Sequence, residues 1–117
     1  MVGIAQGWVS AMGELKHLVL VRFKEGVVVE DILKAIEKLA SDIDTVKSFE
    51  WGQYTGEDET LRQGFTHVFL FTFPSGEDFT SFLGHPSHLE FSGTFAAALE
   101  KFLVFDYPMV QVKPPPA

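Results

Sequence analysis

The segment Thr66–Phe73 has the sequence THVFLFTF, and its pattern is the strongest indication of the fold. Successive side chains of a strand point to opposite faces, so this segment predicts a strand that is apolar on both sides. One face carries a histidine and three rings: His67, Phe69, Phe71 and Phe73. Leu15–Phe23 (LKHLVLVRF) repeats the pattern, with Leu18 and Leu20 on its second face. Its first face carries His17, Val19, Val21 and Phe23. The two segments are therefore predicted to be strands of one sheet, with His17 and His67 on the same face.

The remaining elements follow from periodicity and capping. Helical spacing of apolar residues predicts a helix from Val29 to Ile43, and a capping box at Ser75 predicts a short helix through Leu83. Pro86 predicts the start of a third helix. Its spacing buries an apolar stripe: His88, Phe91, Phe95, Leu99 and Phe102. Further strands are expected at Ser48–Tyr54 and Leu103–Tyr107, with a loop over Thr55–Gly64.

This order of elements predicts an α+β fold, a ferredoxin-like four-stranded antiparallel sheet with its helices on one face. The opposite face is then also apolar, and its residues are Leu18, Leu20, Val68, Leu70, Leu103 and Phe105. Such a patch is unusual on a monomer, and burying it against a copy of itself would be favourable. We therefore expect a homodimer joined sheet to sheet; the alternative is an irregular loop that covers this face.

Composition limits the class of protein. The chain has 117 residues, of which 46% are hydrophobic, including 12 Phe, so one folded domain with a real core is expected. A net charge of −7 argues against a nucleic-acid or membrane-surface partner, and the absence of Cys excludes thiol chemistry. We expect the domain over residues 14–108, an N-terminal appendage over 1–13 and a Pro-rich tail over 109–117. A cytoplasmic location is the default expectation.

The histidines are the main candidates for chemistry. His17 and His67 share one strand face and His88 lies on the apolar side of its helix, so the three are expected to converge on one interior space. Inward imidazoles can serve as a general base, or each can be a buried histidine with a hydrogen-bond partner. His85 is expected to point outward or cap the helix. Asp106 either pairs with a histidine or faces solvent at a strand end.

Several strings in this order resemble one family: KHLVLVRFK, FEWG, RQGFTHVFLFTF, HPSHLEF and LVFDY. Together they resemble the plant stress-responsive α/β-barrel (Dabb) proteins, from Leu15 to Tyr107. The resemblance implies a dimeric α/β barrel of the ferredoxin-like type. Most members are stress or defence proteins with no assigned reaction, and one branch contains polyketide cyclases of the olivetolic acid cyclase type.

For that cyclase branch, the resemblance implies that His88 is the general base and that His17 and His67 line its pocket. The pocket would also include Val19, Val21, Ile36, Phe69, Phe71, Phe82, Phe91 and Leu99. The cyclases hold the substrate carbonyl with a tyrosine where this chain has Phe82, and have a second tyrosine at Ile36. Phenylalanine cannot donate the hydrogen bond to an oxyanion, which can be worth ~3 kcal/mol of barrier. Phe69 and Phe71 are expected to fill the cavity.

We therefore favour a non-catalytic homodimeric stress-response protein that binds a partner or a small hydrophobic ligand. The alternative is a lyase or cyclase that uses His88 as its base. A third interpretation is an oxygenase-like ferredoxin-fold protein with a metal or haem at the histidines. No cofactor is expected under the favoured hypothesis. Some relatives hold a cation such as magnesium near the end of the first helix, which here corresponds to Ala40, Asp42 and Ile43.

Overall fold

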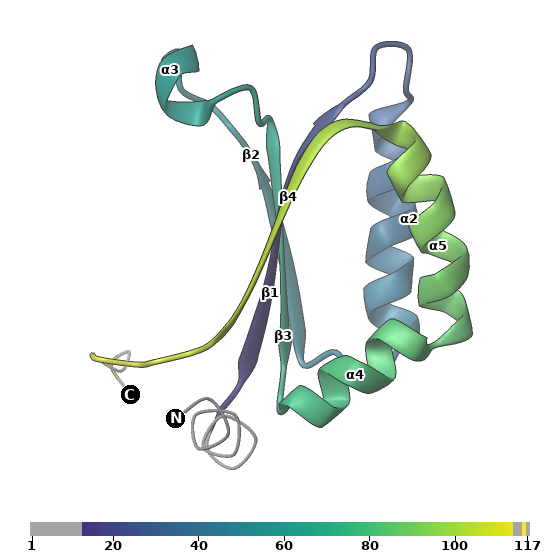
Figure 1. The fold of residues 1–117 in the computed structure, drawn as a ribbon, viewed down its shortest axis with the longest axis vertical. Coiled ribbons are helices and arrows are strands. Elements are labelled where there is room, and N and C mark those ends of the chain that lie inside the picture. Colours follow the sequence, from purple (N-terminus) through teal and green to yellow (C-terminus); the bar gives the residue numbers. More distant parts are fainter. Residues whose placement is uncertain (1–12, 114–115, 117) are drawn as a thin grey trace.

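The computed structural model describes residues 13–113 and 116. Of the appendage expected over residues 1–13, all but residue 13 lies outside the described residues. Four antiparallel strands form one sheet in the order β2-β3-β1-β4. The strands are β1 (Leu15–Phe23), β2 (Ser48–Gln53), β3 (His67–Phe73) and β4 (Leu99–Pro108). The helices are α2 (Val29–Asp42), α3 (Glu59–Arg62), α4 (Gly76–Gly84) and α5 (Pro86–Ala98). Helices α2, α4 and α5 lie on one side of the sheet (Figure 1). The predicted ferredoxin-like α+β fold is confirmed.

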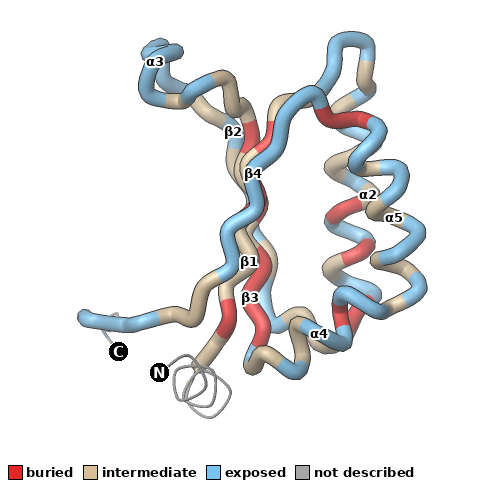
Figure 2. The backbone as a smooth tube through the Cα atoms, viewed as in Figure 1, coloured by how far each residue is buried: buried red, intermediate tan, exposed pale blue. Residues whose placement is uncertain are grey.

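The core lies between the sheet and these helices, where the buried residues of Figure 2 gather. Val21, Phe69 and Phe73 of the sheet are fully enclosed, and so is Phe82 of α4. Ile36 and Leu39 are the buried residues of α2, as the helical spacing predicted. Every second residue of β1 and β3 is thus committed to the core, which leaves the alternate residues on the opposite face.

The predicted starts of α4 and α5 are confirmed. The Ser75 hydroxyl accepts a hydrogen bond from the Asp78 amide at 3.2 Å, and Pro86 occupies the first turn of α5. His85 caps α5, because its ring nitrogen accepts from the Ser87 amide at 3.1 Å. These caps satisfy amides that a helix start leaves without an internal partner.

Two boundaries predicted from sequence are wrong. The last helix does not reach Phe102: it ends at Ala98, and β4 begins at Leu99, which pairs with Phe23 of β1. Phe102 is 62% exposed instead of buried. Apolar residues at every third or fourth position fit a helix, so the spacing predicted one through Phe102. In the structure these residues instead pair with β1 and form the start of β4. The predicted loop over Thr55–Gly64 contains the short helix α3.

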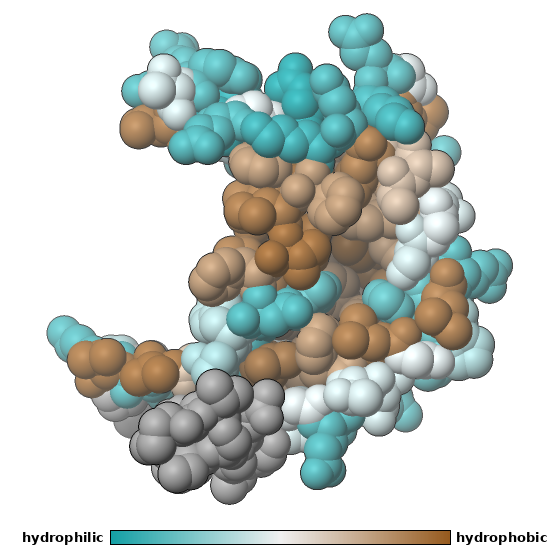
Figure 3. Space-filling model, viewed as in Figure 1, coloured by the Kyte–Doolittle hydropathy of each residue, from teal (hydrophilic) through white to brown (hydrophobic). Residues whose placement is uncertain are grey.

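The sheet face away from α2, α4 and α5 is apolar, as predicted. Leu18 is flanked by Leu70 on β3 and Phe105 on β4, and Leu20 is flanked by Val68 and Leu103. Leu103 is 47% exposed and Phe105 is 58% exposed. We call this the outer face; it forms the apolar concavity in Figure 3.

Across the described part of the chain, none of the helices combines the length and the apolar character that crossing a membrane requires.

Candidate functional site

His17 points from β1 toward the helices and is held by a carboxylate. Its Nδ1 lies 2.5 Å from Asp106 Oδ1, and the two residues are direct neighbours across the β1–β4 ladder. The imidazole also packs beside three rings, with centroid distances of 5.1 Å to Phe79, 5.8 Å to Phe71 and 6.4 Å to Phe82. With Nδ1–H donated to the carboxylate, the neutral ring presents its lone pair on Nε2.

His88 lies in the first turns of α5, directly behind the Phe82 ring. The centroids of these two rings are 4.6 Å apart. His88 Nδ1 lies 3.1 Å from the Leu83 carbonyl oxygen, so Nδ1–H donates and Nε2 carries the lone pair. Burial lowers the pKa of His88; the Leu83 hydrogen bond opposes this and nearby His17 adds to it. His88 is therefore neutral at pH 7 and able to accept a proton.

His17 and His88 border the same cavity, which has a volume of about 60 Å³. Its walls are otherwise apolar apart from Ser92: Val19, Ile36, Leu39, Phe71, Phe82, Phe91, Ser92 and Phe95. Leu39, Ser92 and Phe95 were not among the expected pocket residues, although the helical spacing had put Phe95 on the buried side. Three expected pocket residues, Val21, Phe69 and Leu99, are buried in the core but do not border this cavity. The space admits only a few water-sized groups.

His67 does not join the other two histidines. The β1–β3 register pairs His67 with Val21 and His17 with Phe71, which separates the two imidazoles by four residues, roughly 13 Å along the strands. His67 Nδ1 lies 2.8 Å from the Thr66 hydroxyl, and its ring meets Phe23 edge to face at 5.1 Å. Burial lowers its pKa. The expected convergence of three histidines is thus reduced to His17 and His88.

The region proposed for a cation shows no assembled ligand set. The Asp42 carboxylate pairs with Lys38, and the Ile43 carbonyl accepts a hydrogen bond from the Val46 amide at 3.1 Å. Ala40 packs against the core. Within residues 13–113, no group of three or more His, Cys, Asp or Glu side chains is placed to hold a metal ion. Around Ala40, Asp42 and Ile43, the described residues therefore do not fit a magnesium site.

A larger hollow, with a volume of about 470 Å³, lies on the outer face beside α3. Apolar side chains of three strands and the α3 segment border it, among them Leu20, Leu61, Phe65, Val68 and Leu103. Sequence reasoning missed this feature because it assigned residues 55–64 to a loop. One signal was available: Asp58 caps α3 by accepting from the Thr60 and Leu61 amides, and an acidic residue before a helical turn is typical of such a cap.

The strand order and the one-sided helix layer define a ferredoxin-like α+β protein with an open apolar sheet face. The family model of the stress responsive A/B barrel domain, Dabb, matches residues 15–109. The chain therefore belongs to the stress-responsive A/B barrel domain family, which confirms the resemblance seen in the sequence.

Individual relatives span enzymes and proteins named only for stress response. The chain is 48% identical over 103 residues to a stress-response A/B barrel domain-containing protein of Arabidopsis thaliana, covering 88% of this chain and 93% of the relative. It is 30% identical over 96 residues to olivetolic acid cyclase of Cannabis sativa, covering 80% and 94%.

Solved structures with a similar fold likewise include an enzyme and a protein described only by its fold and assembly. The hydroxynitrile lyase from Passiflora edulis matches with a TM-score of 0.79 at 30% identity, covering 87% of this chain and 98% of that one. A protein from Bacteroides fragilis, with a TM-score of 0.64 at 25% identity over 84% of this chain and 98% of its own, is described as dimeric with a ferredoxin-like fold.

Proposed function

We propose that the chain is a non-catalytic homodimeric stress-response protein, which acts through its paired subunits and binds at most a small apolar ligand. The observation that carries this proposal is the volume of the cavity beside His88, about 60 Å³. Sites for drug-sized ligands have volumes of ~300 Å³ or more. The rings of Phe71, Phe82 and Phe91 border the cavity, so a polyketide chain does not fit against His88 without displacing the core.

The outer face supports the homodimer. Phe105 and Leu103 keep about half of their surface in water in a single subunit. Each 100 Å² of such surface buried against a second copy contributes ~2.5 kcal/mol, before the cost of association. A related bacterial structure is described as dimeric. Two such faces together would close an α/β barrel with the helices outside.

Light scattering and fragment binding test this function together. At micromolar concentration we expect twice the subunit mass of 13.1 kDa. A crystal soaked with aromatic and polyketide-like fragments should show none beside His88. A lone-subunit mass would refute the dimer. A catalytic turnover that disappears in a folded His88→Ala variant would refute the non-catalytic assignment.

A second candidate function is a lyase for a very small hydroxynitrile, and it rests on the His17–His88 pair. His88 is neutral, and its Nε2 lies 3.4 Å from the hydroxyl of Ser92, whose proton is donated to the His88 carbonyl, so the Nε2 lone pair can accept a proton. Asp106 orients His17. His88 would take the proton of the substrate hydroxyl as the carbonyl forms and cyanide leaves with the bonding pair. The cavity would have to admit a substrate of only a few heavy atoms. One structural relative is a hydroxynitrile lyase.

Cyanide release from acetone cyanohydrin tests this candidate. His88→Gln should abolish enzyme-dependent release, whereas His85→Gln, which changes a helix cap outside the cavity, is the matched control. A wild-type rate equal to the buffer rate between pH 5 and 8 would eliminate the lyase and leave the non-catalytic function standing.

A further inference from the structure

Two walls bound the outer face at its opposite ends. The α3 segment stands at one end and the C-terminal segment Met109–Val112, which follows β4, stands at the other (Figure 1). Both project away from the helix layer, which gives the molecule the outline of an open bracket in Figure 3. Because β4 has ten residues between the walls, they lie roughly 30 Å apart.

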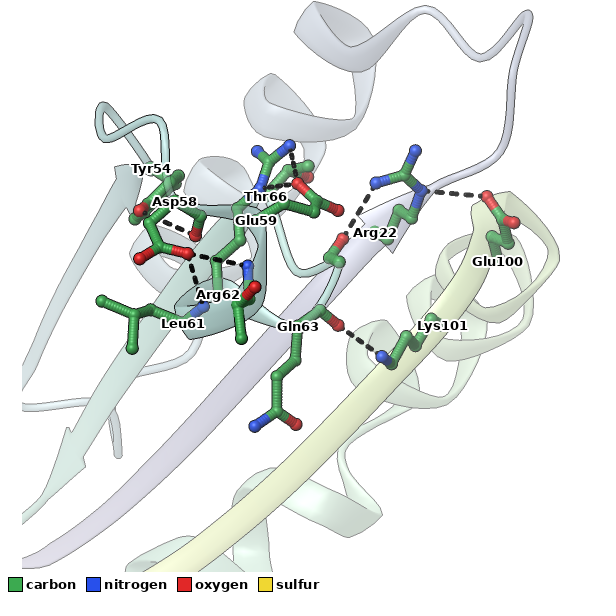
Figure 4. Close-up of polar contacts among 12 residues, drawn as sticks. Arg22, Tyr54, Asp58, Glu59, Leu61, Arg62, Gln63, Thr66, Glu100 and Lys101 are labelled. Atoms are coloured by element: carbon green, nitrogen blue, oxygen red, sulfur yellow. Dashed lines mark hydrogen bonds and ion pairs between the residues drawn. The ribbon is translucent and has the colours of Figure 1, made fainter.

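The α3 wall is fastened to the sheet by cationic side chains (Figure 4). Lys101 Nζ donates to the Gln63 carbonyl at 2.5 Å and lies 4.5 Å from the centre of the Phe65 ring. Arg22 donates to the Gly64 carbonyl at 3.1 Å, and Gln63 and Gly64 both have positive φ angles of 51° and 84°. These contacts fix the position of the α3 segment relative to the sheet. Leu61 of α3 borders the 470 Å³ hollow and is 77% exposed.

The other wall carries apolar side chains that no other part of residues 13–113 covers. Val110 is 68% exposed and Val112 is 91% exposed. The hollow beside α3 is bordered by apolar groups of matching character, including Leu20, Phe65 and Leu103. Within one chain the two features cannot meet, because they stand at opposite ends of the sheet.

We propose that the hollow beside α3 receives the segment Met109–Val112 of a second copy, so that each subunit completes the other's pocket. This inference rests on the proposed homodimer and specifies its two-fold axis. A two-fold axis that lies between the two sheets and runs perpendicular to the strands exchanges the two ends of the outer face. Each α3 wall then contacts the C-terminal segment of the other subunit. An axis along the strands sets α3 against α3 instead, which holds the two sheets apart and leaves Phe105 and Leu103 in water.

Engineered cysteines test this arrangement, since the chain contains no Cys of its own. A disulfide requires Cα atoms within ~7 Å, so residues 61 and 110 can be joined only between subunits. The double variant Leu61→Cys, Val110→Cys should form a covalent dimer on mild oxidation, visible on a non-reducing gel. We expect at least about tenfold more of it than in either single variant, because only the paired positions meet this distance.

A control variant, Leu61→Cys with Val28→Cys, places the second thiol on a residue that is 60% exposed and precedes α2, outside the hollow. It should not exceed the single variants. If Leu61→Cys alone forms the covalent dimer, the axis runs along the strands and the inference is wrong. If the double variant has the mass of a dimer but does not crosslink, the inference fails while the homodimer stands. A lone-subunit mass for the unmodified protein overturns both.

Discussion

At the residue scale, Phe82 determines what the histidines can do. It is 1% exposed, and its ring lies 4.6 Å from the His88 ring and 5.3 Å from the Phe71 ring. Phe82 borders the cavity, and its phenyl ring offers no hydrogen-bond donor to it. The Phe82 ring thus contributes to the core but supplies no hydroxyl that could donate a hydrogen bond to a substrate carbonyl.

Phe71→Ala should destabilise the protein by ~3–5 kcal/mol, because Phe71 is 3% exposed and packs against four other rings. The free energy of unfolding from a urea titration measures this loss. Leu89→Ala, on a side chain of α5 that is 62% exposed, is the matched control and should change stability by less than ~0.5 kcal/mol. A loss near zero for Phe71→Ala would mean that the ring is not part of the core.

Acid should destabilise the fold through His67 and His88. Burial lowers the pKa of both below the unfolded value of 6.5, so the unfolded chain binds protons more readily. Their stabilising contribution is therefore complete above pH 6.5 and is lost as the pH falls through the folded-state pKa values. Urea titrations between pH 7.5 and 5 measure the free energy of unfolding at each pH. As the pH is lowered, this free energy should decrease less steeply for His67→Gln and for His88→Gln than for the wild type. Parallel curves for all three proteins would contradict this prediction.

At the element scale, caps fix where the helices start. Ser75 accepts from the Asp78 amide and donates to the Asp78 carboxylate at 2.9 Å, which is a reciprocal contact at the start of α4. Helix α4 carries Phe82, which borders the histidine cavity, and Phe79, whose ring centroid lies 5.1 Å from that of His17. The cap thereby positions part of the candidate site.

Ser75→Ala should cost ~1 kcal/mol in the free energy of unfolding, because one amide of the first turn loses its partner. Ser75→Asp keeps an acceptor at the cap and should recover most of this loss. Ser81→Ala, on an exposed residue inside the same helix, should be neutral or slightly stabilising. An equal loss in Ser75→Ala and Ser81→Ala would show that the cap contributes nothing.

The end of α5 shows where element prediction failed. Leu99 and Phe102 continue the apolar spacing of α5, and only the pairing of Leu99 with Phe23 and of Phe102 with Val21 places them in β4. Helix starts were predictable because caps are local in sequence. This helix end was not, because a partner strand more than seventy residues away determines it.

At the scale of the whole molecule, the outer face determines assembly. Phe105→Asp would place a carboxylate in the centre of the proposed interface, where burying an unpaired charge costs several kcal/mol (~3 or more). Light scattering should then report the mass of a single 13.1 kDa subunit at micromolar concentration. Leu89→Asp makes the same chemical change on the exposed side of α5 and should leave the dimer intact. A dimeric Phe105→Asp protein would place the interface elsewhere.

Local patterns in the chain were enough to predict the four strands, the starts of α2, α4 and α5 and the two apolar faces of the sheet, because each depends on residues close together in the chain. The alternation of the strands and the helical spacing also put His17, Phe71 and His88 on inward-facing positions, whereas Phe82 was placed in the pocket only by the family resemblance. The separation of His67 from His17 and His88 could not be predicted in this way, since the β1–β3 register sets it. Only the structure reduced the cavity to about 60 Å³, because the free volume depends on how rings from separate elements pack together.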